Sequence, residues 1–241
     1  MPVRLAPDPG AGVFETMLVV EGVALEEDAH RRRLRRSAEE LYGAGVDWPD
    51  APTGGPLRWR VDVRPSETGI ELSCTCSELH WRPDWGWTES PARLIPVTVA
   101  AGLGRNKWSD RRDLDRLAAG GGVLLVDAEG QVLETERASV LLVEGDRLVL
   151  PPREAEVLPG VTLERVRTIG LEHGLDVVRT RVPLERLLAA DEVLLTGSLR
   201  GVEPVDGCGR RTWAQWPLGR RLGRWFGIAR SEELRSRSQP S

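Results

Sequence analysis

The sequence predicts an α+β fold built from two subdomains, and three observations lead to this prediction. Runs of β-branched or alternating apolar residues separated by short turns, such as Val13–Val20, indicate antiparallel hairpins. Apolar residues at helical spacing, such as Leu34, Ala38 and Leu41, are interspersed with these runs. Segment 102–109 is polar and contains two glycines, which is typical of a connector between subdomains.

The first part of the chain is expected to form a small lobe of hairpins and one helix. The turn Glu21-Gly22 folds the first strand back onto residues 23–25. A helix begins at Asp28 and ends before Gly43, because glycine readily closes a helix. Alternating apolar residues predict two further antiparallel strands and a short one, at 57–63, 70–76 and 97–101.

The second part is expected to contain hairpins and several helices. Pro159-Gly160 precedes a helix from Val161 to His173, because proline and glycine commonly flank a helix start. The other expected elements are helices 111–119 and 184–190, strands 123–126, 132–133, 140–143, 148–150, 176–178 and 192–195, and a final amphipathic helix around Leu222. We therefore assign an N-terminal subdomain to 1–102, a connector to 103–109, a C-terminal subdomain to 110–230 and a frayed tail to 231–241.

Composition excludes several classes of partner. The net charge of −4, with acids and bases mixed along most of the chain, argues against an extended nucleic-acid surface. No stretch is apolar for long enough to span a membrane, and the first residues lack the apolar segment of a signal peptide. The three cysteines do not cluster as metal ligands do, so no metal is expected. We expect a soluble cytoplasmic protein that acts on a small molecule.

The 33 basic residues include a single lysine, Lys107. Arginine can replace lysine at a surface, in an ion pair or at a phosphate, but it cannot replace a lysine that must lose its proton. A lone lysine is therefore a candidate covalent nucleophile, most naturally one that forms a Schiff base with an aldehyde. The alternative is an accidental survivor of a coding bias that favours arginine. Its position in the expected connector, beside both subdomains, suits an amine that holds an aldehyde cofactor.

Several motifs accompany this lysine in a defined order. They are Gly12-Val13-Phe14-Glu15-Thr16-Met17, His30 with Arg33-Leu34 and Ser37-Ala38, Gly130-Gln131-Val132-Leu133-Glu134-Thr135, Leu158-Pro159-Gly160-Val161-Thr162 and Leu195-Thr196-Gly197-Ser198. Together they resemble the fold-type IV, or class IV, pyridoxal-phosphate enzymes, which include branched-chain and D-amino-acid aminotransferases and aminodeoxychorismate lyase. The resemblance extends from about Gly12 to Val205.

The resemblance implies pyridoxal 5′-phosphate as the cofactor and Lys107 as its Schiff-base lysine. It implies that Arg33, Val161, Thr162 and Ser198 bind the cofactor phosphate, and that Glu134 pairs with the pyridine nitrogen. It also implies a small N-terminal α/β sandwich-like lobe, a larger C-terminal β-pseudobarrel lobe with helices, a cofactor site between them, and a homodimer. Two departures concern the substrate pocket more than the cofactor: Ser139 stands where the family usually has Asn, and Leu163 where it often has Arg.

Two reactions are consistent with these residues. A lyase would use Lys107 as nucleophile and then as general base, and would release pyruvate and 4-aminobenzoate from 4-amino-4-deoxychorismate; this requires a low pKa for the Lys107 ammonium. The segment Lys107-Trp108-Ser109-Asp110-Arg111 resembles lyase-type relatives, and no Tyr-x-Arg-Pro segment of the branched-chain enzymes is present. An aminotransferase of the branched-chain or D-amino-acid type would use Lys107 to move a proton between substrate and cofactor. A non-catalytic relative is a third alternative, which retention of Lys107 and Glu134 argues against.

Overall fold

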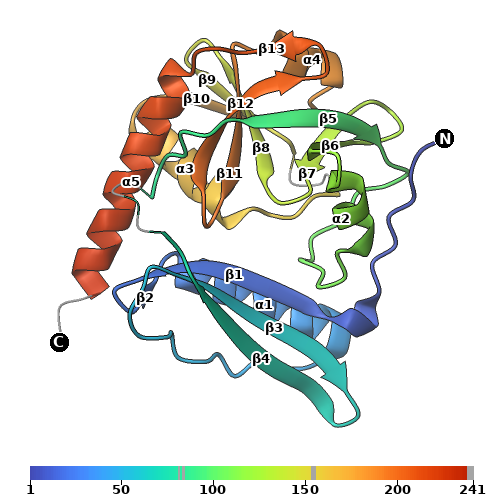
Figure 1. The fold of residues 1–241 in the computed structure, drawn as a ribbon, viewed down its shortest axis with the longest axis vertical. Coiled ribbons are helices and arrows are strands. Elements are labelled where there is room, and N and C mark those ends of the chain that lie inside the picture. The colour runs from blue at the N-terminus through green and yellow to red at the C-terminus, as the bar shows by residue number, and fades with distance from the viewer. Residues whose placement is uncertain (81, 83–84, 153–155, 238–241) are drawn as a thin grey trace. The chain divides into compact units, whose positions relative to one another are not determined.

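The structure is a computed structural model that describes residues 1–80, 82, 85–152 and 156–237 (Figure 1). The chain divides into two compact units, each with its own sheet. The barrel unit comprises Met1–Ala6, Asp84–Arg105 and Arg112–Gly227, and the sheet unit comprises Pro7–Pro83, Asn106–Arg111 and Ile228–Ser241. Within the described residues, no helix is both long and apolar enough to cross a membrane.

The sheet unit is an antiparallel four-stranded sheet with one helix on one face (Figure 1). Its strands lie in the order β2 (Val23–Ala24), β1 (Val13–Val20), β3 (Leu57–Ser66), β4 (Gly69–Glu78), and a 3-10 turn, η1 (Pro9–Ala11), precedes β1. Helix α1 (Glu27–Tyr42) packs Leu34 and Ala38 against Met17 and Trp59, because these residues repeat at helical spacing on one face. Gly43 ends the helix with a positive φ of 64°, which glycine adopts without strain.

The barrel unit contains a closed ring of strands. The strands are β5 (Ala92–Thr98), β6 (Gly122–Val126), β7 (Val132–Thr135), β8 (Ser139–Glu144), β9 (Arg147–Leu150), β10 (Asp176–Arg179), β11 (Glu192–Gly197), β12 (Gly201–Cys208) and β13 (Arg211–Thr212). The order β8-β11-β12-β5-β6-β7 returns to β8 because Glu134 of β7 pairs with Ser139 of β8. Strands β9 and β10 extend the sheet beside β8, and β13 pairs with β12.

The helices of the barrel unit cover this sheet. They are α2 (Arg112–Ala118), α3 (Val161–Glu172), α4 (Leu184–Ala189) and the first part of α5 (Pro217–Arg237). The barrel core is aliphatic, with Leu124, Val140, Leu142 and Leu195 almost fully buried. Such a core follows from strands that are apolar at nearly every position, as expected when both faces of a sheet are covered. The structure confirms the predicted α+β class with two sheets, one of them closed.

Three details differ from the sequence-based expectations. The strand expected at 97–101 is β5, Ala92–Thr98, and it belongs to the barrel unit because it pairs with β6 and β12. Strand β12 was not among the expected strands, and it contains Pro204, a residue type that counts against a strand interior. The expected frayed tail is helical as far as Arg237, and α5 is anchored by the buried pair of Arg230 with Glu26. Residues 238–241, and part of the Trp-rich segment from Trp81, lie outside the described residues.

Candidate functional site

Lys107 belongs to the sheet unit, where its backbone is fixed to the start of β1. The Phe14 N–H donates to the Lys107 carbonyl at 2.9 Å, the Ser109 N–H donates to the Gly12 carbonyl at 2.9 Å, and Trp108 forms an antiparallel bridge with Val13. The Lys107 Nζ lies 5.1 Å from the centroid of the Phe14 ring, within the range of a cation–π contact. The side chain is half-buried, so the amine lies against the protein instead of extending into bulk water.

A partly buried ion pair, Arg60 with Asp62, lies on the same side of this unit as Phe14. The Arg60 guanidinium binds Asp62 through Nε and Nη2, each at 2.6 Å, and stands 3.7 Å above the centroid of the Phe14 ring. The Ser109 hydroxyl donates to the same carboxylate at 3.0 Å. Asp62 therefore connects β3 to the residue two positions after Lys107, which helps to fix the segment that carries the lysine.

Arg33 is held by a buried carboxylate from β1. Its Nε donates to Glu15 Oε1 at 2.6 Å and its Nη2 donates to Glu15 Oε2 at 2.7 Å, a two-point contact that fixes the plane of the guanidinium. His30 lies one helical turn before Arg33 on α1, and its Nδ1 is 2.7 Å from Glu15 Oε2. All three side chains are buried. Successive side chains of a strand point to opposite faces. Phe14 therefore contacts Lys107 from one face of β1, and the next residue, Glu15, binds Arg33 from the other face.

Burial and charge set the protonation of this group. Burial alone would raise the pKa of Glu15, but the Arg33 guanidinium and the His30 ring lower it well below its ordinary value, so the carboxylate stays ionised. Burial lowers the pKa of His30, although Glu15 pulls it upward. A neutral His30 can donate one Nδ1–H to Glu15, which leaves a single buried anion facing a single buried cation.

Glu134 is positioned at the point where the barrel closes. The turn after β7 is held by Thr135, whose hydroxyl donates to the Ala138 carbonyl at 3.0 Å and accepts from the Ala138 N–H at 2.9 Å. The Leu158 N–H donates to both Glu134 carboxylate oxygens at 3.3 Å. Glu134 is 8 % exposed, so an ionised carboxylate here calls for donors or a cation around it.

The N-terminus of α3 begins beside this carboxylate. Gly160 is its N-cap and offers no side-chain hydrogen bond to the first turn, whose N–H groups have no partner inside the helix. A Cβ at Gly160 would lie 2.4 Å from the Ser139 hydroxyl, so only glycine lets the turn approach β8 this closely. A helix N-terminus of this kind favours an anion through its N–H groups and its dipole.

Two buried hydroxyls next to this turn have no hydrogen-bond partner among the residues that the structure describes. They are Thr162 Oγ1, in the first turn of α3, and Thr196 Oγ1, on β11 directly opposite Ser139. A buried polar group without a partner costs about 1–3 kcal/mol, so native proteins rarely retain one without a reason. The bare helix N-terminus and these hydroxyls together fit a bound phosphate, which can accept several hydrogen bonds at once.

Another buried carboxylate, Glu203, binds arginines from two turns of the barrel unit. Glu203 of β12 is 2 % exposed and accepts from Arg137 Nη1 at 2.8 Å, from Arg137 Nη2 at 3.0 Å and from Arg200 Nη2 at 2.7 Å. Arg137 lies in the turn between β7 and β8, and Arg200 lies in the turn that follows Ser198. Ser198 is half-buried in this turn, at the end of β11.

Within the barrel unit, the structure thus brings Glu134, Val161 and Thr162 to one region around Ser139. Within the sheet unit it attaches Lys107 and Arg33 to neighbouring residues of β1. Sequence reasoning gave no role to Glu15, Thr196 or Glu203. Glu15 carried a detectable signal, since it is the only charged residue in the apolar strand Val13–Val20.

Known proteins resemble this chain in sequence and in fold. The family model "Amino-transferase class IV" matches residues 111–208. A probable branched-chain-amino-acid aminotransferase from Thermotoga maritima is 34% identical over 219 residues, which cover 80% of this chain and 76% of that protein. The chain belongs to the class IV aminotransferase family. Two further branched-chain aminotransferases match over shorter segments, and the chain spans only 27% and 22% of their lengths.

Solved structures of the class IV family share the fold of this chain. A hypothetical aminotransferase from Mycobacterium tuberculosis, in a PLP-bound form, superposes with a TM-score of 0.76 at 20% identity and covers 97% of this chain and 95% of that one. A putative 4-amino-4-deoxychorismate lyase from Legionella pneumophila gives a TM-score of 0.76 at 22% identity, with coverage of 92% and 93%. At this level of identity the similarity establishes the fold.

Proposed function

We propose that this protein is a pyridoxal-phosphate-dependent enzyme that acts on a primary amine. The observation that carries the proposal is the unsatisfied anion site in the barrel unit, where Thr162 and Thr196 present partnerless hydroxyls beside the bare N-terminus of α3. A protein that retains these groups needs an anionic ligand to satisfy them. Related proteins named as aminotransferases, one of them PLP-bound, support a phosphate that belongs to pyridoxal phosphate.

Each candidate residue then has a defined task. Bound pyridoxal phosphate supplies an aldehyde that condenses with amines and a protonated ring that withdraws electrons from the substrate carbon. Thr162, the Val161 N–H, Ser198 and Arg33 would bind the phosphate, and Glu15 holds the Arg33 guanidinium in one orientation. Glu134 would accept the N–H of the pyridine ring and stabilise its positive charge.

Lys107 is the nucleophile and the general base. Its amine would hold the cofactor through the aldehyde. The same amine, when free, would remove the proton from the carbon that bears the substrate nitrogen. Contacts from Phe14 and the backbone bridge at Trp108 hold the lysine segment in place for both steps.

The reaction we propose is the conversion of 4-amino-4-deoxychorismate to 4-aminobenzoate and pyruvate. Lys107 would remove the ring proton, and the C–O bond between the ring and the enolpyruvyl group would then break. The departing enolpyruvate takes up one proton and becomes pyruvate, so the protons balance. No oxidant or second substrate is needed, because aromatisation drives the step. Support comes from the resemblance of Lys107-Trp108-Ser109-Asp110-Arg111 to lyase-type relatives.

Transamination of amino acids is the second candidate. It is favoured by the 34% identical relative from Thermotoga maritima, which is named as a branched-chain aminotransferase. Lys107 would then move the proton taken from the substrate carbon, and no group would be eliminated from the substrate. The family resemblance also leads us to propose a cytoplasmic homodimer for either reaction.

One experiment separates these reactions. Purified protein is incubated with 4-amino-4-deoxychorismate and no keto acid, and 4-aminobenzoate and pyruvate are quantified. Equal amounts of both products support the lyase. Conversion of the cofactor to its pyridoxamine form by an amino acid, without these products, supports the aminotransferase and overturns the lyase.

The role of Lys107 is tested separately with Lys107→Ala and Lys107→Arg. Both variants are expected to lose activity by more than about 1,000-fold, since a positioned proton-transfer group contributes about 10²–10⁴-fold before its nucleophilic role is counted. Borohydride treatment followed by denaturation and mass spectrometry should leave cofactor attached to the wild type alone. Attachment in either variant would show that another residue is the nucleophile.

A further inference from the structure

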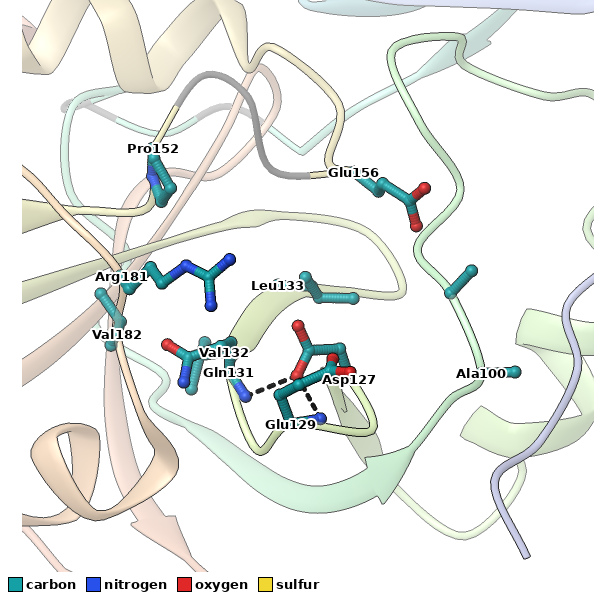
Figure 2. Close-up of a pocket in the computed structure, with 11 residues that line it drawn as sticks. Ala100, Asp127, Glu129, Gln131, Val132, Leu133, Pro152, Glu156, Arg181 and Val182 are labelled. Carbon is teal, nitrogen blue, oxygen red and sulfur yellow. Dashed lines mark hydrogen bonds between the residues drawn. The ribbon is translucent and has the colours of Figure 1, made fainter.

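A cavity lies within the barrel unit, lined by none of the residues assigned above to the cofactor. Its volume is about 420 Å³, in the range of small-molecule sites. Its lining comes from the ends of β6 and β7, the residues after β5 and β10, and the loop before α3 (Figure 2). Val132, Leu133, Val182 and Pro152 give it apolar walls.

The polar side chains of this cavity are not matched with one another. Among the residues that the structure describes, Arg181, Glu129 and Glu156 form no ion pair, and Glu156 Oε2 accepts only the Gly102 N–H, at 2.9 Å. The buried Oε1 of Gln131 has no hydrogen-bond partner there either. Asp127 differs from these, because its Oδ1 accepts the N–H groups of Glu129 and Gln131 at 3.0 Å and 2.7 Å and so shapes the turn.

The unmatched groups fall at two ends of the cavity. Gln131 and Arg181 lie close together because their segments pair: Gln131 bridges Pro183, and the Val132 N–H donates to the Val182 carbonyl at 2.8 Å. Figure 2 shows the Glu156 carboxylate on the opposite side, with Leu133 between it and Arg181. A carboxyl-binding cation and a buried acceptor therefore occur at one end, an apolar wall in the middle, and an acidic side chain at the other.

We propose that this cavity binds a basic α-amino acid, such as lysine, at a site separate from the cofactor. The ligand carboxylate pairs with Arg181, and the α-ammonium donates to Gln131 Oε1, because these two ligand groups are attached to one carbon. The methylene chain lies on Leu133 and Val182, and the terminal cation meets Glu156 and Glu129. The net negative charge of the lining favours a ligand with one more cation than anion.

Three probes of nearly equal length test this arrangement by calorimetry on the cofactor-loaded protein. L-Lysine carries all three charged groups, L-norleucine lacks the terminal ammonium, and cadaverine lacks the carboxylate. Each truncated probe is expected to bind about tenfold to hundredfold more weakly than lysine, the range that a hydrogen bond to a charged group supports.

Paired variants assign each loss to its residue. Arg181→Gln should weaken lysine by about tenfold or more and leave cadaverine unchanged, and Glu156→Gln should weaken lysine and leave norleucine unchanged. Arg165→Gln, an exposed arginine outside the cavity, is the control and should bind like the wild type. Equal loss of all three probes in Arg181→Gln, or unaltered lysine binding, would overturn the proposal.

The Lys107→Ala variant keeps this test independent of the proposed reaction. Lysine binding at the cavity is expected to persist in that variant, because none of the cavity residues belongs to the cofactor site. Binding that disappears with Lys107→Ala and persists in Arg181→Gln would locate lysine at the cofactor and refute the cavity site. Absence of any catalytic activity in the wild type would refute the proposed function and leave the cavity result intact.

Discussion

The two units satisfy their polar residues in opposite ways. In the sheet unit the buried charges have partners inside the protein, since Glu15 binds Arg33 and His30, and Asp62 binds Arg60. In the barrel unit, Thr162 Oγ1 has no partner among the described residues, and α3 has no side-chain cap. The buried carboxylates Glu15 and Asp62 of the sheet unit are thus paired within the protein, whereas the barrel unit retains buried hydroxyls that an anion would satisfy.

The paired charges fix side-chain orientation before a ligand binds, whereas the unsatisfied hydroxyls gain hydrogen bonds only when it binds. A cation fixed by Glu15 keeps one orientation whether or not a ligand is bound, so binding costs little further ordering of that side chain. Unsatisfied hydroxyls make the ligand-free barrel unit less stable than it would be with a ligand bound, and binding recovers that loss. Three substitutions can break or sharpen this comparison.

The largest effect is expected from Glu15→Gln in the sheet unit. Removing the carboxylate charge breaks the buried two-point ion pair with Arg33, and breaking a buried ion pair costs about 3–5 kcal/mol. Hydrogen exchange of the β1 and α1 amides should report this loss. Glu71→Gln, an exposed carboxylate on β4, is the control and should change protection little. A loss below about 1 kcal/mol in Glu15→Gln would mean that the internal pairing does not hold this unit together.

An effect of intermediate size is expected from Thr162→Val in the barrel unit, with opposite signs for the stability of the cofactor-free protein and for its cofactor affinity. The cofactor-free protein should be as stable as the wild type or more so, because a buried hydroxyl without a partner is removed. Affinity for pyridoxal phosphate should fall by about tenfold to hundredfold, since hydrogen bonds to charged groups contribute about 1.5–3 kcal/mol. Urea unfolding and cofactor titration measure the two quantities.

Thr135→Val is the matched control for that substitution. The Thr135 hydroxyl is buried in the same unit but makes two hydrogen bonds to Ala138, so its loss should destabilise the cofactor-free protein by about 1 kcal/mol. If Thr162→Val destabilises the cofactor-free protein as Thr135→Val does, the Thr162 hydroxyl has a partner in solution and the contrast between the units disappears.

The smallest effect concerns the pH dependence of the sheet unit. Burial lowers the pKa of His30 in the folded protein, so below about pH 6.5 the unfolded chain binds more protons and stability falls as pH falls. The lowered pKa of Glu15 acts in the same direction at more acidic pH. His30→Gln should therefore flatten the pH dependence of thermal unfolding between about pH 6.5 and 5. His80→Gln, an exposed histidine of the same unit, should retain the wild-type slope.

The sequence by itself determined the α+β class, most strands and helices, and the identity of the lysine. Helical spacing and alternation report which side chains share a face, and this information is local. The single lysine, Lys107, is likewise visible in the composition alone, and arginine cannot replace a lysine that must lose its proton. The order of the motifs was sufficient to indicate the family.

Only the tertiary structure decided how these residues are supported. Strand β12 pairs despite Pro204, β5 belongs to the barrel unit, and Glu134 sits where β7 meets β8 and closes the ring. Glu15 acquires its role because β1 packs against α1 and excludes water from three ionisable groups. The lack of a partner for the Thr162 hydroxyl among the described residues, and the gathering of Arg181 with acidic side chains around one cavity, arise from contacts between segments distant in the chain. Such contacts depend on the packing of the whole unit, which no local pattern encodes.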